Sequence, residues 1–201
     1  MRSAVRILGC CAVLVAAPRS AHAEWHFTPF VGFTFGGNTT FVDLELGAEE
    51  VHFNWGGATT LIGAGPIGLE ALFAHAPAFF QGNAPTEVPV LRSRALALMG
   101  NVVLATPRRW NEYGLRPFVS GGLGLMHASK TDERALFPGD NLLGYNIGGG
   151  AVGFLSRRTG LRFELRRYAS FEVEEPETVG ISIGPLNLSY WTATIGVVFR
   201  Y

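Results

Sequence analysis

The sequence predicts an all-β fold, an eight-stranded antiparallel up-and-down transmembrane β-barrel with short periplasmic turns and long extracellular loops. Three observations point to it. Apolar residues make up 48 % of the 201 residues and charged residues only 16 %, whereas an average soluble domain is about 25 % charged. Eight segments alternate in polarity with a period of two, as strands do, and none has a sustained helical period. The connections between them are short at one end and long at the other, which is typical of outer-membrane barrels.

The N-terminus has the three parts of a secretory signal. Arg2 and Arg6 give a basic start, residues 7–17 an apolar core, and Ala21-His22-Ala23 a cleavage site between small residues. We therefore expect residues 1–23 to be a cleaved signal peptide and residues 24–201 to be one outer-membrane β-barrel domain. Both cysteines lie in the signal, so the mature chain suits an exported protein that forms no disulfide.

Eight alternating segments are expected to be the strands: 25–35, 55–64, 67–76, 94–105, 116–128, 142–155, 161–171 and 189–201. The connections at 63–66 and 156–160 are tight, and 107–114 is of moderate length. The remaining connections are longer: 36–54, 77–93, 129–141 and 172–188. Because the short side of such barrels faces the periplasm, both ends of the mature chain are expected there.

The last strand runs to the final residue, Tyr201, on an alternating apolar pattern. A strand at a chain end is ordinarily frayed unless something holds it. An unpaired backbone group costs several kcal/mol in hydrocarbon, so a sheet lies there only if its edges close on each other. We therefore expect residues 189–201 to pair with residues 25–35.

Side-chain volume predicts which face of the sheet meets lipid. The first strand carries an unbroken apolar face: Trp25, Phe27, Pro29, Val31, Phe33 and Phe35. The interior of an eight-stranded barrel is barely wide enough for side chains, and such faces would overfill it. The apolar faces are therefore expected outside. The strand at 55–64 is too rich in glycine and threonine for its faces to be assigned.

The opposite faces carry the charges, and we expect them to form a network in the lumen: Glu70, Asn101, Arg162, Glu164, Arg166 and Arg200. Each buried arginine should be paired or hydrated, because an isolated charge is costly to bury. Glycines on the inward faces of the fifth and sixth strands leave room for guanidinium groups. Tyr168 and Tyr190 also have inward parity and are expected to cap the lumen. The alternative is a soluble sheet whose charges face water.

The cleaved signal, the eight strands and the aromatic C-terminus resemble the small outer-membrane β-barrel family that includes the OmpA transmembrane domain and OmpX. The resemblance covers residues 24–201 and implies a location in the cell outer membrane, among its lipids and lipopolysaccharide. The family includes adhesins, structural anchors, small-solute proteins and a few enzymes, and for this chain we expect a structural or surface-interaction role without enzymatic activity. Four terminal residues are similar to the signal recognised by the barrel-assembly machinery, which is thus implied as a transient partner: Ile195, Val197, Phe199 and Tyr201.

Two other functions stay open. One is a narrow porin-like passage for small solutes, which the lumen charges would oppose if they plug it. The other is a lipid-facing lipid A hydrolase, because His127 and Ser129 share an outward face. Lipid A deacylases of similar size carry their His-x-Ser on the penultimate strand, however, and residues 165–170 contain no histidine. Asp132, Glu133 or Asp140 could supply an acid, but nothing in the sequence fixes one nearby.

No other chemistry is indicated. The histidines are scattered and match no metal-site spacing. Without its signal the chain keeps 13 of the 16 basic residues against 16 acidic ones, and no basic stripe suggests nucleic acid. We therefore expect a monomer with no catalytic residue, no metal site and no cofactor.

Overall fold

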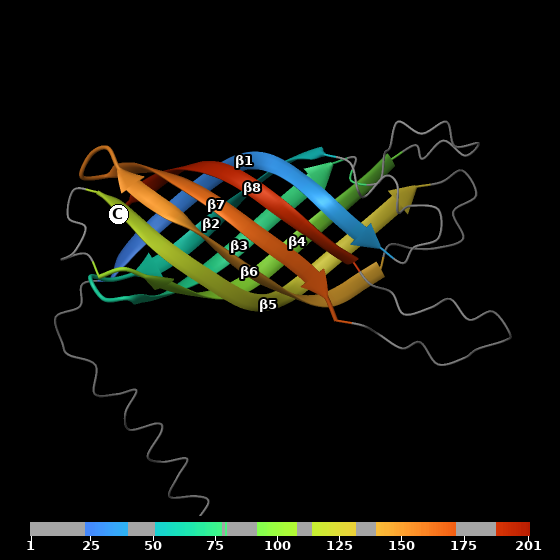
Figure 1. Ribbon diagram of the computed structural model, residues 1–201, viewed down its shortest axis with the longest axis horizontal. Coiled ribbons are helices and arrows are strands. Elements are labelled where there is room, and N and C mark those ends of the chain that lie inside the picture. The colour runs from blue at the N-terminus through green and yellow to red at the C-terminus, as the bar shows by residue number, and fades with distance from the viewer. Residues whose placement is uncertain are drawn as a thin grey trace, which may run out of the picture.

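The computed structural model describes residues 23–39, 51–77, 79, 92–107, 114–131, 140–171 and 188–201. They form eight strands: β1 (Glu24–Thr39), β2 (His52–Ile62), β3 (Ile67–Pro77), β4 (Arg92–Ala105), β5 (Leu115–Thr131), β6 (Asp140–Phe154), β7 (Thr159–Ser170) and β8 (Leu188–Arg200). Each strand pairs with its sequence neighbours, and the sheet closes into a barrel whose strands run obliquely to its axis (Figure 1). The predicted eight-stranded antiparallel up-and-down barrel is confirmed. The expected signal peptide lies, except for Ala23, outside the described residues, and no described helix is long and apolar enough to cross a membrane.

The barrel closes between β1 and β8, as the sequence predicts. Val31 pairs with Ile195 and Phe27 with Phe199, and the Tyr201 amide donates a hydrogen bond of 2.9 Å to the Trp25 carbonyl. The C-terminus thus lies at the end with the short turns (Figure 1). The strands are staggered around the barrel. Going from each residue to its partner on the next strand, Glu24 leads once around the sheet to Thr34, ten residues further along β1. The partners on the way are Ile62, Gly68, Val103, Ser120, Gly148, Arg166 and Thr192. This stagger of ten residues means that a row of paired residues climbs toward the loop end from β1 to β8.

Several strands extend further on the loop side than the sequence predicts, and β1 shows why. Its pairing with β8 shifts between Phe35 and Asn38, and Gly36 has a φ of 58°, in the left-handed region that favours glycine. This β-bulge adds one residue and breaks the alternation, so the sequence pattern ends at Phe35 although the strand continues to Thr39.

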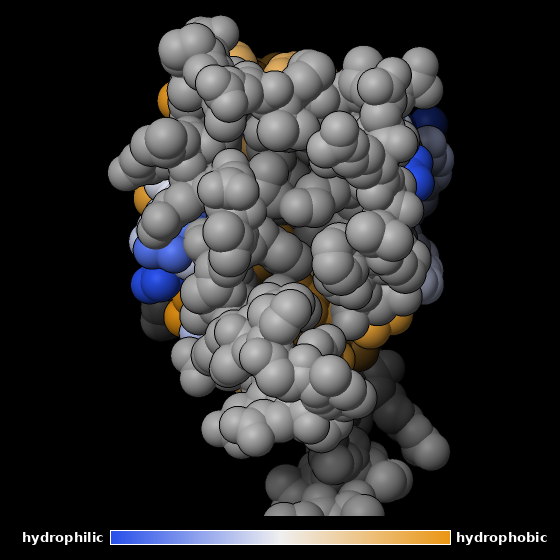
Figure 2. All heavy atoms as spheres, turned by 90° about the vertical axis from the view of Figure 1, so that its right-hand side faces the viewer, coloured by the Kyte–Doolittle hydropathy of each residue, from blue (hydrophilic) through white to orange (hydrophobic). Residues whose placement is uncertain are grey.

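The apolar faces form the exterior of the barrel. Phe33 and Leu165 are 55 % and 47 % exposed, whereas Arg166 is only 1 % exposed. On β2, which the sequence left unassigned, Phe53 and Trp55 point outward while Asn54 and Thr60 are buried. Seen from the loop end, apolar atoms lie around the rim of the barrel, with hydrophilic atoms at two sides (Figure 2). The wall is that of a barrel surrounded by lipid.

The lumen is filled in three layers. Near the short turns lies a small apolar cluster of Ile62, Val103, Ala105 and Phe118, against which Val152 packs. The buried glutamates and arginines of β3 and β7 occupy the middle. Toward the loops lies a larger cluster that includes Leu72, Met99, Met126, Leu142, Tyr168, Leu188, Tyr190 and Phe79. Apolar layers therefore cover the charges from both ends.

Arg116 ties together the turns at the short end. Its Nε donates to the Thr106 carbonyl at 2.8 Å, and its Nη2 donates to the Gly65 carbonyl at 2.9 Å. One side chain thus links the β2–β3 turn to the segment after β4.

We expect Arg116→Met to lower the free energy of unfolding by about 1.5–3 kcal/mol, because the carbonyls lose a charged donor while the apolar stem is kept. Urea unfolding of the protein in lipid vesicles measures the change. Arg158→Met, at an exposed turn residue of the same end, is the control and should change stability by less than about 0.5 kcal/mol. An equal loss in both variants would contradict this role of Arg116.

Candidate functional site

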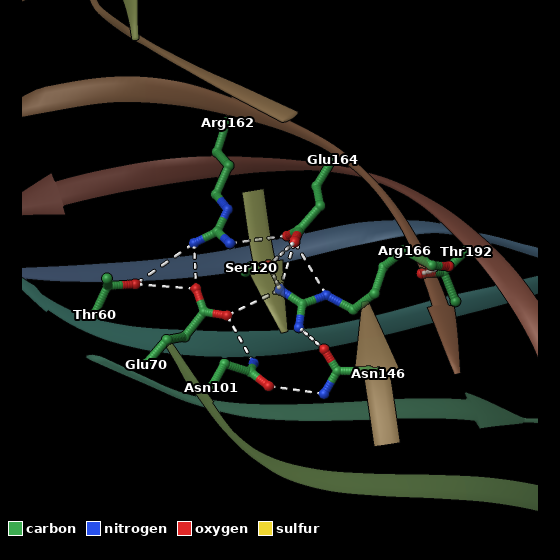
Figure 3. Close-up of polar contacts among 9 residues, drawn as sticks. All are labelled: Thr60, Glu70, Asn101, Ser120, Asn146, Arg162, Glu164, Arg166 and Thr192. Atoms are coloured by element: carbon green, nitrogen blue, oxygen red, sulfur yellow. Dashed lines mark hydrogen bonds and ion pairs between the residues drawn. The ribbon is translucent and has the colours of Figure 1, made fainter. Parts of the chain in front are cut away.

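The central layer of the lumen gathers charged, amide and hydroxyl side chains (Figure 3), which come from six strands, β2 to β7. Alternate residues of a strand share a face, so Arg162, Glu164 and Arg166 of β7 all point inward. Opposite them lie Glu70 of β3, Asn101 of β4, Ser120 of β5 and Asn146 of β6. We call these seven residues, together with Thr60 of β2, the lumen network.

Two arginines and two glutamates of the lumen network form a closed ring of ion pairs. Arg162 Nη1 lies 2.6 Å from Glu70 Oε2, and its Nη2 lies 2.9 Å from Glu164 Oε2. Arg166 Nη2 lies 2.9 Å from Glu70 Oε1, and the same guanidinium binds Glu164 Oε1 through its Nε at 3.0 Å. Each carboxylate thus has two arginines and each arginine two carboxylates, so the ring has no net charge.

Uncharged side chains complete the coordination of the ring. Asn101 Nδ2 donates to Glu70 Oε1 at 2.9 Å, and Asn146 Nδ2 donates to Asn101 Oδ1 at 2.7 Å. Arg166 donates to Asn146 Oδ1 and to Ser120 Oγ, the latter at 3.0 Å. Thr60 Oγ1 donates to Glu70 Oε2 at 3.1 Å. The network therefore links β2 to β7 across the lumen.

Glycines make the room that this ring needs. A Cβ on Gly148 would lie 3.0 Å from Arg166 Cβ and Cγ, and one on Gly122 would lie 2.4 Å from Asn101 Oδ1. A larger residue at either position would displace a member of the network. Two residue types thus act together, the charged ones on β3 and β7 and the glycines on the strands between.

Burial decides what the ring can do. The four charged side chains are between 0 % and 8 % exposed. Removing such ions from water costs several kcal/mol each, and their attraction offsets this only if the geometry is good and the remaining atoms are bonded. The cavities on either side are small, about 30 Å³ toward the short turns and about 10 Å³ toward the loops. The arrangement cross-links the wall and fills the lumen.

The structure brings five of the six residues expected in the network together: Glu70, Asn101, Arg162, Glu164 and Arg166. The placement of Arg200 was wrong. Its Nε lies 3.6 Å from Glu24 Oε2 and its guanidinium lies 5.2 Å from the centre of the Phe154 ring, at the short-turn end. Parity places Arg200 on the inner face correctly, but its position at the end of β8 keeps it out of the central layer.

The loop-side layer contains a stack of aromatic rings. Tyr168 and Tyr190 are buried and stack with ring centres 5.0 Å apart. Phe79, which follows β3, is fully buried with its ring centre 4.9 Å from that of Tyr190. The tyrosines match their expected parity, whereas Phe79 belongs to no alternating segment, so parity does not show on which face it lies.

Among the described residues, no catalytic arrangement forms around His127, the histidine considered for a lipid hydrolase. His127 points outward from β5 and pairs with Leu96 of β4. Ser129 lies two residues further on the same strand, but its side chain is outside the described part of the chain. Asp132 and Glu133 also lie outside it, as does the side chain of Asp140.

Comparison with known proteins identifies the fold and nothing finer. No family model matches the sequence, and no curated protein matches it either. Among solved structures, Neisserial surface protein A has a TM-score of 0.61 at 9 % identity, covering 89 % of this chain and 97 % of its own.

Two further structures are similar. Outer membrane protein OprG from Pseudomonas aeruginosa has a TM-score of 0.57 at 10 % identity, covering 90 % of this chain and 97 % of its own. Ail, the attachment invasion locus protein of Yersinia pestis, has a TM-score of 0.52 at 11 % identity, covering 89 % and 99 %. The chain thus has the fold of the small eight-stranded outer-membrane β-barrels, and its outer wall is apolar, as in a barrel surrounded by lipid.

Proposed function

We propose that this protein is a non-conducting, non-enzymatic outer-membrane barrel with a structural or surface-interaction role. The observation that carries the proposal is the closed ring of two glutamates and two arginines across the lumen. In this role the barrel is a rigid support, and recognition belongs to the longer connections at the end opposite the termini.

The filled lumen argues against a passage for solutes. A permeating ion would have to separate Arg166 from Glu70 or Arg162 from Glu164, and each separation would leave buried charges without a partner. It would then meet the apolar cluster around Tyr168 and Tyr190. Both barriers lie in series along the barrel axis, so the porin-like alternative requires two rearrangements at once.

The surroundings implied by the fold are part of the same proposal. The outer wall fits outer-membrane lipid and lipopolysaccharide. Three of the four terminal residues expected to form the assembly signal, Ile195, Val197 and Phe199, point outward from β8, and Tyr201 follows at the chain end. Recognition by the barrel-assembly machinery and a monomeric state stay predictions.

Planar-bilayer recording tests the proposal. We expect purified, folded protein to produce no stable conductance step, while a general porin added afterwards to the same bilayer does. Heat-modifiable migration on a denaturing gel shows that the protein is folded, because closed barrels resist detergent until boiled. Reproducible steps from the folded protein would overturn the non-conducting role and favour the porin-like one.

A further inference from the structure

The lipid-facing wall is not evenly filled: an open groove of about 740 Å³ lies across β6, β7, β8, β1 and β2. Its floor is made of small residues, Gly149, Ala151 and Ala193. Its sides are made of large apolar ones, Val31, Phe33, Phe53, Phe163, Leu165 and Ile195. The lining is almost wholly apolar, so the groove suits a hydrocarbon chain.

The strand register shows how small and large residues alternate along the groove. Phe33, Ala193, Leu165 and Gly149 are consecutive partners across β1, β8, β7 and β6. Ala193 therefore lies low between two larger neighbours. The lining residues come from five strands, so at a strand spacing of about 4.8 Å the groove extends over roughly 20 Å of the sheet, with Phe33 and Leu165 rising on either side of Ala193. An acyl chain can lie against Ala193 between these two side chains.

A cation lies beside the groove on its loop side. Arg167 is exposed on the outer wall, two residues from Leu165 on the same face of β7. Its partner across the ladder is Trp191, which is two residues from Ala193 on β8, and its guanidinium carbon lies 5.9 Å from the centre of the Trp191 ring. Within the described residues no carboxylate pairs with it. A lipid-facing arginine is unfavourable in hydrocarbon, and an anion at the headgroup level would offset that cost.

We propose that the groove and Arg167 together bind one molecule of lipid A, with a phosphate on the guanidinium and an acyl chain against Ala193. The proposal rests on the proposed function, because that function places the loop end, and so Arg167, in the outer leaflet. Trp191 holds the guanidinium by a cation–π contact, and a phosphate accepts hydrogen bonds from its free edge.

Charge favours lipid over a second copy of the chain. A two-fold contact through this face would bring the same patch of both copies together, and therefore both Arg167 side chains, with no described carboxylate between them. A phosphate-bearing lipid brings the opposite charge and an acyl chain at once. Both parts of the site then have a partner.

Native mass spectrometry of the full mature protein, purified in detergent and incubated with lipid A, tests the site. We expect wild-type protein to retain one lipid A, Arg167→Gln to bind it about tenfold more weakly, and Arg167→Lys to keep most of the affinity. Ala193→Leu, which fills the groove, should weaken binding similarly. Matched controls on other strands, Arg94→Gln and Ala71→Leu, should bind like wild type.

Several results would overturn the site. The first is that Arg167→Gln retains as much lipid A as wild type does. The second is that wild-type protein retains dephosphorylated lipid A, or phosphatidylglycerol, as well as it retains lipid A. The third is that the protein forms a dimer through this face. The Ala193→Leu result counts only if the variant is folded, which heat-modifiable migration shows. If it is not folded, the Arg167→Gln result alone decides whether the site binds lipid A. Membrane fractionation and bilayer recording of the same variants test the proposed function separately from this site. The membrane location and the lack of conductance should be those of wild type even if lipid A does not bind.

Discussion

Glu70→Ala is expected to destabilise the barrel by about 3–5 kcal/mol, because it removes one partner from each of two buried charges. Arg162 and Arg166 would each keep Glu164 alone, and the ring would carry an excess positive charge in the lumen. Asn101 and Thr60 would lose their carboxylate acceptor as well. Urea unfolding in lipid vesicles, followed by tryptophan fluorescence, measures the loss.

Glu24→Ala is the matched control for Glu70. Glu24 lies at the short-turn rim with 29 % of its side chain exposed, and Arg200 Nε is 3.6 Å from it. An ion pair so open to water contributes about 0–1 kcal/mol. If Glu70→Ala cost no more than Glu24→Ala, the ring would have no structural role and the argument for a sealed lumen would fail.

Val119→Arg is expected to cost about 2–4 kcal/mol, the range measured for arginine on the lipid face near the bilayer midplane. Val119 is 55 % exposed on the outer face of β5. It lies four residues beyond the start of that strand, which for a tilted strand is about 10 Å from the short-turn end. The same vesicle unfolding measurement gives the change.

The control for Val119 is on the same strand and face. Leu115 is 60 % exposed at the first position of β5, where the wall meets the interface. Leu115→Arg is expected to cost about 0–1 kcal/mol, because the side chain reaches water. Equal costs at the two depths would show that the wall does not contact hydrocarbon.

Much of this fold is present in the sequence because one rule acts on every strand. Alternation of large apolar residues with small or polar ones gives the number of strands, and the volume of the lumen gives the direction of each face. The rule fails where its residues are small. On β2, Gly56 and Gly57 and three neighbouring polar or small residues hide the pattern, and at Gly36 the bulge shifts it by one.

The central site was only partly predictable, for a different reason. Parity tells which face a residue lies on but not its height in the barrel, and height depends on the stagger between strands. Arg200 and Arg162 share the inner face, yet only Arg162 reaches Glu70. Thr60 was missed because its strand had no assigned face. Contacts between β3 and β7 depend on the whole closed sheet, and no local pattern contains that information.

The seam between the first and last strands constrains how the protein is made. His26 pairs with Arg200, so the ladder that completes the sheet joins positions that lie 174 residues apart in the sequence (200 − 26). Such non-local pairing is slow, because the entropy of closing a long loop is lost before the contacts that compensate for it have formed. The sheet therefore cannot close until β8 is available, and until then the apolar side chains of the outer wall must be shielded from aggregation.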